Sequence, residues 1–511
     1  MTEKTRFLVG FRYSATVPQE VVEAIDVFMA AQQEIQEVRR LSGGQRVLEM
    51  SFEQAGLLAA QRPDLSIEED RALQALSLIP GLPPRLPQEI RGSLRVRTVD
   101  DASGEGLGQL PVYGLGREIA YEAVTDENGR AGIDIHETAL GHILAAPRQG
   151  YWSKIVLAPA IQEETECEIR LQKQAPASGY DWWQRILGLD QLEGKFTGRG
   201  VKIGLVDSGV AEHESLNPAG GKNALAGDDS AWRIDEDGHG THCAGVLTAQ
   251  GNGITGMAPA AELYSVKVYP GGRLSDFVEA LNWCIDNYMD VVCIGVGSTC
   301  PAQQMEVVLL EAYDRGITCV AAAGNDGGPV AFPAAYDHVL AVSAMGKAGT
   351  FPEDAVHAWA LGEPSGYEGL FSAAFSNVGP EIDLCAPGVA ILSTVPGGHA
   401  AWDGTSMACA SVAGLAALIL AGYPEIRTGD AYQTHNMRRI LFASATDLGL
   451  PRELQGAGLP DAAAALADAV VRRAQDEADL KDYKKSLKTA LTQARREVEH
   501  IERALAELND K

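Results

Sequence analysis

The chain has 511 residues, which is too long for one hydrophobic core and corresponds to about three to four domains of ordinary size. Hydrophobic residues make up 46% and charged residues 22%, values that exclude a disordered or a fibrous chain. The formal net charge of −27 argues against nucleic acid and anionic membranes as partners, because both bind to basic surfaces.

The N-terminal segment and the cysteines predict a cytoplasmic location. The start of the chain, MTEKTRFLVGFRYSATVP, lacks an apolar segment of signal-peptide length. The longest apolar run, Val412 to Ala421, is much shorter than the roughly 20 residues that a membrane span requires. Eight cysteines without a CxxC pair argue against a zinc cluster and favour reduced, buried thiols.

Residues 1–78 predict a small α+β unit. The segment FLVGFR is typical of a strand, and Val17 to Gln33 has the periodicity of an amphipathic helix. A hairpin over EVRRLSGGQRVLEMSF, a helix over EQAGLLAAQ and a strand over LSIEED complete the order βαββαβ. This order predicts a ferredoxin-like antiparallel sheet with two helices on one face. The proline-rich IPGLPPRLP that follows predicts a linker over residues 79–90.

Residues 91–171 predict a β-sandwich. Five segments with strand character alternate with turns, namely SLRVRTVD, AYEAVTD, AGIDIHE, SKIVLAP and CEIRL. The turn that follows AYEAVTD contains Asn128-Gly129, the pair favoured in tight hairpins. We therefore expect a hairpin at this turn.

Residues 178–470 predict a parallel α/β sheet flanked by helices. Apolar strands such as VKIGLVD, ELYSVKV, DVVCIGV and ITCVAAA alternate with helical patterns. The tail, residues 471–511, is charged and helical, and its apolar residues from Leu480 to Leu508 follow a heptad spacing. A coiled coil that joins a second copy of the chain or a partner protein is one interpretation. A helix folded back on the α/β unit of its own chain is the other.

Four side chains of the α/β unit lie at strand ends and helix starts, where such folds usually place their catalytic and binding residues. Asp207 ends one strand, and His239 and Ser406 each begin an apolar helical run. A serine hydroxyl becomes a nucleophile when an imidazole takes its proton, and a carboxylate orients that imidazole. Asn325 ends a further strand, and its amide could stabilise an oxyanion together with the backbone N–H of Ser406.

The segments around these residues resemble the signatures of the subtilisin-like serine proteases. DSG at Asp207, GHGTHCAG at His239, AAGN at Asn325 and GTSMA at Ser406 stand in that family's order over about residues 180–470. The resemblance implies a serine endopeptidase that acts on polypeptides through an acyl-enzyme. One departure is Cys409-Ala410-Ser411 where the family usually has Ser-Pro-His. A catalytically silent scaffold protein is the alternative of another class.

The resemblance also implies a substrate cleft, and we expect its walls to pair with an extended peptide through main-chain hydrogen bonds. The contacts implied are Gly272, Arg273 and Leu274 on one edge, Gly295, Val296 and Gly297 on the other, and Ala322, Ala323 and Gly324 in the specificity pocket.

We expect no metal site and no cofactor. The segment after His239 is shorter than the calcium-binding loop of longer relatives and offers no carboxylate, so calcium is left open without an assignable site. Cys243 is interpreted as a core thiol, with regulatory oxidation as the alternative. His242 is interpreted as structural.

The two flanking units also have family resemblances. Residues 1–78 resemble the inhibitory propeptide of secreted subtilisins, whose last segment lies in the substrate cleft until the enzyme cuts it. This implies a zymogen that cleaves itself between about Arg71 and Ile79, and an uncleaved docking domain is the alternative. Residues 91–171 resemble carboxypeptidase-regulatory-like or transthyretin-like accessory domains, for which a substrate exosite is the less favoured role.

Overall fold

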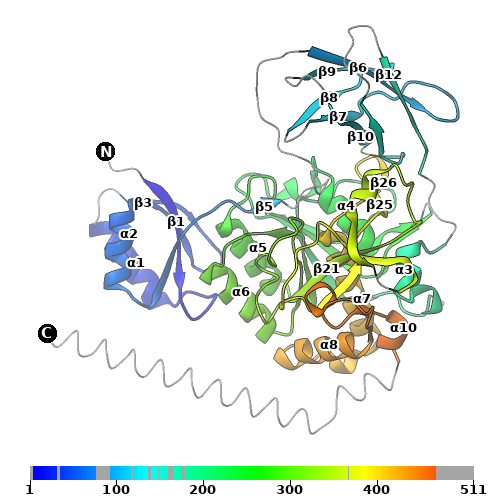
Figure 1. Ribbon diagram of the computed structural model, residues 1–511. Helices are drawn as coiled ribbons and strands as arrows, with labels where there is room; N and C mark the ends of the chain where they lie inside the picture. The colour runs from blue at the N-terminus through cyan, green and yellow to red at the C-terminus, as the bar shows by residue number, and fades with distance from the viewer. Residues whose placement is uncertain are drawn as a thin grey trace, which may run out of the picture.

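The structure is a computed structural model, drawn in Figure 1. It describes residues 4–31, 35–75, 92–116, 119–135, 140–147, 149–158, 166–174, 179–192, 194–251, 253–365 and 367–467. The predicted linker at 79–90 and the predicted helical tail at 471–511 lie outside the described residues.

A mainly parallel sheet forms the centre of the molecule. Its strands run in the order β14-β17-β13-β18-β20-β21-β23-β22, with β24 also paired to β21. They are β13 (Lys202–Asp207), β14 (Gly220–Asn223), β17 (Glu262–Lys267), β18 (Val291–Ile294), β20 (Thr318–Ala322), β21 (Leu340–Lys347), β22 (Leu361–Ser365), β23 (Leu370–Ala373) and β24 (Leu384–Pro387). The central strands are apolar on both faces because helices cover the sheet, as parallel sheets require.

The helices of this unit pack around the sheet (Figure 1). They are α3 (Trp182–Ile186), α4 (His239–Thr248), α5 (Leu274–Asp286), α6 (Gln303–Asp314), α7 (Thr405–Gly422), α8 (Ala431–Ala443), α9 (Arg452–Gln455) and α10 (Ala462–Ala465). By length and composition alone α7 could span a membrane, but 89% of its most apolar window is buried in the protein. It is therefore a core helix, and it packs against α4, β18, β20 and β21.

The N-terminal unit contains four strands and two helices. They are β1 (Thr5–Phe11), α1 (Gln19–Ala31), β2 (Gln36–Arg40), β3 (Arg46–Met50), α2 (Phe52–Gln61) and β4 (Leu65–Glu69). The sheet has the order β2-β3-β1-β4, and all three pairs of neighbouring strands are antiparallel. This unit packs against the central α/β unit, because Leu8, Leu41 and Val47 belong to the same buried cluster as the apolar residues of α5 and α6.

The second unit is a sandwich of two sheets with the orders β11-β10-β7-β8 and β12-β6-β9. Its strands are β6 (Gly92–Asp100), β7 (Pro111–Leu115), β8 (Ala120–Val124), β9 (Arg130–Ile135), β10 (His142–Ala145), β11 (Lys154–Leu157) and β12 (Glu166–Leu171). Sequence reasoning missed β7 and β10, which are short and flanked by glycine or proline.

The predicted hairpin at Asn128-Gly129 is wrong. The turn exists, but β8 pairs with β7 whereas β9 pairs with β6, so the chain crosses from one sheet to the other there. Gly129 has a φ of 78°, and a Cβ at this position would lie 2.2 Å from the carbonyl oxygen of Thr98. The glycine is therefore required by the close crossing and not by a two-residue hairpin.

Candidate active site

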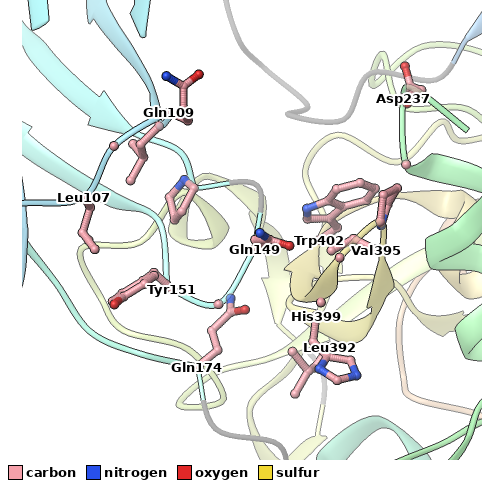
Figure 2. A pocket seen from close by; sticks show the side chains of 18 of the residues that line it. Leu107, Gln109, Gln149, Tyr151, Gln174, Asp237, Leu392, Val395, His399 and Trp402 are labelled. Atoms are coloured by element: carbon pink, nitrogen blue, oxygen red, sulfur yellow. The ribbon is translucent and has the colours of Figure 1, made fainter. Parts of the chain in front are cut away.

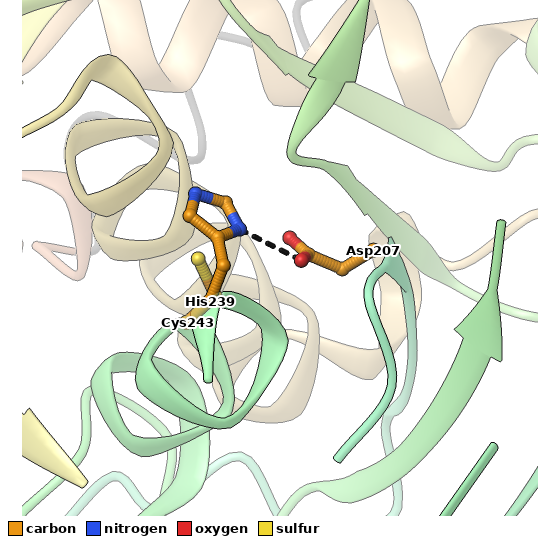
Figure 3. Close-up of side chains that lie close together, drawn as sticks. All are labelled: Asp207, His239 and Cys243. Carbon is orange, nitrogen blue, oxygen red and sulfur yellow. Dashed lines mark hydrogen bonds and ion pairs between the residues drawn. The ribbon is translucent and has the colours of Figure 1, made fainter. Parts of the chain in front are cut away.

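A buried hydrogen bond joins Asp207 to His239 (Figure 3). Asp207 is the last residue of β13, and His239 is the first residue of α4. The Nδ1–H of His239 donates to Oδ1 of Asp207 over 2.7 Å, and the carboxylate is 1% exposed. Gly238 leads into the helix with a φ of 86°, a conformation that glycine adopts without strain. This contact fixes the orientation of the ring and its tautomer.

A second carboxylate, which sequence reasoning missed, holds the start of α4 in place. Oδ2 of Asp235 accepts from the backbone N–H and the hydroxyl of Thr241 at 2.8 and 2.6 Å. Its Oδ1 accepts from the N–H of Gly238 and the hydroxyl of Ser208, both at 2.9 Å. The N-cap of α4 is Gly238, and Asp235 lies three residues before it, so the usual preference for aspartate at the N-cap does not mark this residue.

The charges around His239 favour its protonated form. Burial is the largest single effect and lowers the pKa of the imidazole, but the charge and hydrogen bond of Asp207, together with the more distant Asp237 and Asp235, raise it by more in combination. The pKa of His239 is therefore raised above its usual 6.5. The ring is therefore a neutral base only at a pH above this raised pKa.

Ser406 and Asn325 lie around one small space beside Gly404. A Cβ placed on Gly404 would stand 3.5 Å from Nδ2 of Asn325 and 3.8 Å from the backbone N of Ser406, so both donors border this point. Oδ1 of Asn325 accepts from the N–H and the hydroxyl of Thr405 at 3.0 and 2.8 Å, which turns the amide nitrogen toward the space. The first turn of α7 adds its positive end.

The hydroxyl of Ser406 is fully buried and forms no hydrogen bond with any of the described residues. Ser406 is the second residue of α7, and α7 packs against α4, which begins at His239. The two helices therefore bring the serine and the imidazole to one region at the sheet. A nucleophile without a resting partner is common in proteases before substrate binds.

The first predicted cleft wall is only partly extended. Arg273 is the N-cap of α5 in an extended conformation and pairs with Ala72, whereas Leu274 is already the first helical residue. The expectation of a strand through Gly272 to Leu274 is therefore wrong at its last residue. The N–H of Leu274 nevertheless donates to the carbonyl of Arg71 at 2.9 Å, because the first N–H groups of a helix have no partner inside it.

The second predicted wall lies against the Asp207–His239 pair. A Cβ on Gly295 would be 2.1 Å from Oδ2 of Asp207 and 3.2 Å from Cε1 of His239, so a larger residue does not fit. The next two residues form β19 (Val296–Gly297), which pairs antiparallel with β5 (Gln74–Ala75). The chain's own residues 71–75 therefore lie as a strand between the two segments, and the N–H of Leu73 donates to the carbonyl of Gly272 at 2.8 Å.

The three residues assigned to a specificity pocket are buried and connect β20 to Asn325. Ala322 ends β20, and the carbonyl of Ala323 accepts from the N–H of Ala331 at 2.9 Å. Gly324 has a φ of 112°, and a Cβ there would lie 2.2 Å from Nδ2 of Asn377. These residues therefore fix the position of Asn325, and their contact with a substrate stays a prediction.

Cys243 lies next to the pair, as Figure 3 shows. Within the described ranges, Asp207, His239 and Cys243 are the only three metal-ligating side chains whose donor atoms all lie within 4.8 Å. Burial raises the pKa of the Cys243 thiol well above its usual value, and metal binding and oxidation both require the thiolate. This favours the interpretation of Cys243 as a core thiol.

His242 has a structural environment. Its ring is fully buried, stacks on Trp402 with centroids 4.8 Å apart, and binds the carbonyl of Ala400 through Nε2 at 3.0 Å. Burial lowers the pKa of His242 to about 3, so the ring is neutral at ordinary pH. It supports the segment that leads to Ser406.

A parallel α/β unit with a buried aspartate–histidine pair beside a serine at a helix start is the architecture of one class of serine hydrolases. The family model described as the Subtilase family matches residues 198–459, just over half of the chain. The protein therefore belongs to the subtilase family and is a subtilisin-like serine endopeptidase.

Individual relatives agree with this assignment. The chain is 34% identical over 304 residues to a thermostable alkaline protease of Halalkalibacterium halodurans, covering 58% of this chain and 74% of the relative. It is 37% identical over 276 residues to Subtilisin Savinase of Lederbergia lenta, covering 53% and 91%. It is 35% identical over 266 residues to a subtilisin of Bacillus pumilus, covering 50% and 86%.

Proposed function

We propose that Asp207, His239 and Ser406 form the catalytic triad of this endopeptidase, with Asn325 as the side-chain donor to the oxyanion. The buried 2.7 Å hydrogen bond between Asp207 and His239 is the main support for this assignment. The position of the Asn325 amide and the Ser406 N–H around one point supports it further.

In this mechanism Nε2 of His239 removes the proton from the hydroxyl of Ser406 while its oxygen attacks the peptide carbonyl carbon. The oxyanion that forms is held by the amide of Asn325 and the N–H of Ser406. The imidazolium gives its proton to the leaving amine, and the peptide bond breaks to leave an acyl-enzyme. Water, deprotonated by the same ring, then releases the acyl group and restores the serine.

We further propose that residues 1 to about 78 act as an intramolecular inhibitor. The support is the strand of residues 71–75, which uses the backbone hydrogen bonds that a substrate would use. Because the cleft can hold only one such strand, the bound segment keeps other polypeptides out.

Two carboxylates hold this segment against helix starts. Oε2 and Oε1 of Glu68 accept from the N–H groups of Gln303 and Gln304, at 2.7 and 2.8 Å, at the N-terminus of α6. Asp70 accepts from the N–H and hydroxyl of Ser275, at 2.9 and 3.0 Å, at the N-terminus of α5. Negative charge is favourable at both places because the first N–H groups of a helix are unpaired there.

The pairing suggests where the chain would be cut within the interval from Arg71 to Ile79. Gln74 pairs with Gly297 and Ala75 with Val296, so the described strand ends opposite the residue that follows Gly295. Because Gly295 lies against the Asp207–His239 pair, we propose cleavage of the bond after Leu76.

The experiment is to purify the full chain and its Ser406→Ala variant and to follow both by intact-mass spectrometry. We expect the wild-type protein to release a fragment ending at Leu76, and the variant to stay intact. Equal processing of the two proteins would contradict self-cleavage. A processed wild-type protein whose Ser406 does not react with a fluorophosphonate would instead favour the scaffold alternative.

The cysteines support a reducing compartment as the site of action. All eight lie among the described residues, and none is in a disulfide bond; the Sγ atoms of Cys293 and Cys409 are 3.6 Å apart. We therefore propose that the enzyme works where thiols stay reduced.

A further inference from the structure

A cavity of about 690 Å³ lies between the β-sandwich and the protease unit (Figure 2). One wall comes from sandwich residues 106–110, 147, 149–151 and 174. The other comes from residues 236–238, directly before His239, and from residues 392–402. These last residues belong to the hairpin of β25 (Ile391–Val395) and β26 (Gly398–Trp402), which leads to Ser406. The volume is in the range of ligand sites.

Hydrogen bonds hold the two walls together. The N–H of Gly150 donates to the carbonyl of His399 at 2.8 Å, and Oε1 of Gln174 accepts from the N–H of Ala401 at 3.2 Å. Outside the hairpin, the N–H of Ile155 in the sandwich donates to the carbonyl of Asp354 in the protease unit at 2.6 Å. The first two of these hydrogen bonds join the sandwich to the hairpin, so its loops form one wall of the cavity.

The cavity lies where the leaving half of a substrate would go. Residues 71–75 run toward Gly295 and the Asp207–His239 pair, so a peptide in this strip has its scissile bond at the pair and continues beyond it. The helix that begins at His239, α4, packs directly against β25 of the β25–β26 hairpin. Gly238, the residue before His239, faces the cavity wall, since a Cβ on it would be 3.1 Å from both Pro396 and Trp402.

The lining has the chemistry to bind a basic side chain. Among the described residues that line the cavity, Glu236 supplies an exposed carboxylate and none is lysine or arginine. On the sandwich side of the described residues, Lys173 beside Tyr151 is paired with Asp100 at 3.2 Å. Leu107, Tyr151 and Trp402 supply apolar and aromatic surface along which a long aliphatic stem can lie.

We propose that this cavity binds the substrate segment C-terminal to the scissile bond and selects a lysine or arginine side chain there, with the β-sandwich as one wall of the site. The inference rests on the proposed function, because it takes the Asp207–His239 pair as the place of cleavage. It gives the sandwich a direct role in substrate recognition.

The test uses enzyme that is produced as the full chain and has then processed itself. Two quenched peptides are compared, which differ only in having Lys or Glu at the second residue after the cleaved bond. A short peptide anilide, which ends at the scissile bond, reports the catalytic centre alone. Three variants each raise the net charge by one unit: Glu236→Gln and Gln109→Arg in the cavity, and Asp134→Asn on the exposed face of β9 as the matched control.

We expect the wild-type enzyme to prefer the Lys peptide by about five-fold or more in kcat/KM. Each cavity variant should lower this preference about two- to five-fold, the size of an exposed charge interaction, whereas Asp134→Asn should not change it. Anilide hydrolysis should be the same in all four proteins. A processed wild-type enzyme with no Lys preference, or a preference that Gln109→Arg leaves unchanged, would overturn the role of the sandwich. Failure of the wild type on the anilide would overturn the proposed function itself, and this inference with it.

Discussion

The two units that flank the protease meet it in different ways. The N-terminal unit shares a buried cluster with α5 and α6, and its strand of residues 71–75 fills the strip between Gly272 and Gly297. The β-sandwich keeps a core of its own and meets the protease unit through a few hydrogen bonds to the β25–β26 hairpin and through Trp152, which packs against the protease core beside His357. The first unit therefore closes a site by occupying it, whereas the second leaves a cavity open beside it. An accessory unit can thus act on a protease by blocking or by extending its binding surface.

The largest expected effect concerns the candidate active site. Asn325→Asp keeps the acceptor for Thr405 but replaces the donor Nδ2 with an oxygen. We expect kcat to fall by about 10²- to 10³-fold with little change in KM, a magnitude that comes from the corresponding donor in subtilisin itself. Steady-state kinetics on the peptide anilide measure it. Thr405→Ser keeps the hydroxyl and is the control. A change in KM with kcat unaltered would contradict the assignment.

The second prediction tests whether the N-terminal unit blocks the cleft through its backbone. Leu73→Pro removes the N–H that donates to Gly272, while Leu73→Ala changes the side chain and keeps that donor. We expect the proline variant to become active about ten-fold sooner after purification, and the alanine variant to resemble the wild type. The time course of peptidase activity in freshly purified protein gives the result. Identical time courses for both variants would show that this hydrogen bond does not maintain latency.

A third, smaller effect concerns pH. Because Asp207 and the nearby carboxylates raise the pKa of His239 above 6.5, the neutral base appears only as the pH rises through the raised value, and activity should increase on the alkaline side. Asp237→Asn removes one contribution and should move the rising limb of kcat/KM to lower pH by about half a unit. The sandwich variant Asp134→Asn should not move it. A shift to higher pH would contradict the electrostatic argument.

The smallest effect is expected at the contact of the sandwich with the protease. Lys154→Ala removes the partly exposed ion pair with Asp354, whose charged atoms are 3.1 Å apart. We expect the free energy of unfolding to fall by less than about 1 kcal/mol, and the difference to disappear in high salt. Denaturant titration measures it, and anilide hydrolysis should not change. A loss of several kcal/mol would mean that the sandwich is bound as firmly as the N-terminal unit.

Local patterns were sufficient for the residues of the candidate site and for most of the strands. Asp207, His239, Asn325 and Ser406 each follow or begin an apolar element, and the short-range rules of strands and helices predict their places. Asp235 was missed because it acts through hydrogen bonds to residues on either side of the helix start, and no periodic pattern marks such a network. The hairpin at Gly129 was predicted wrongly because turn residues do not reveal which strands will pair.

The sequence alone determined the family, the enzyme class and the side chains proposed for catalysis, because these depend on residue types at fixed short spacings. Only the tertiary structure decided that residues 71–75 pair with Val296 and Gly297, that β8 and β9 belong to different sheets, and that the sandwich and the hairpin enclose a cavity beside His239. Each of these joins residues that are far apart in the chain. Such contacts follow from how whole surfaces pack together, which local patterns do not encode.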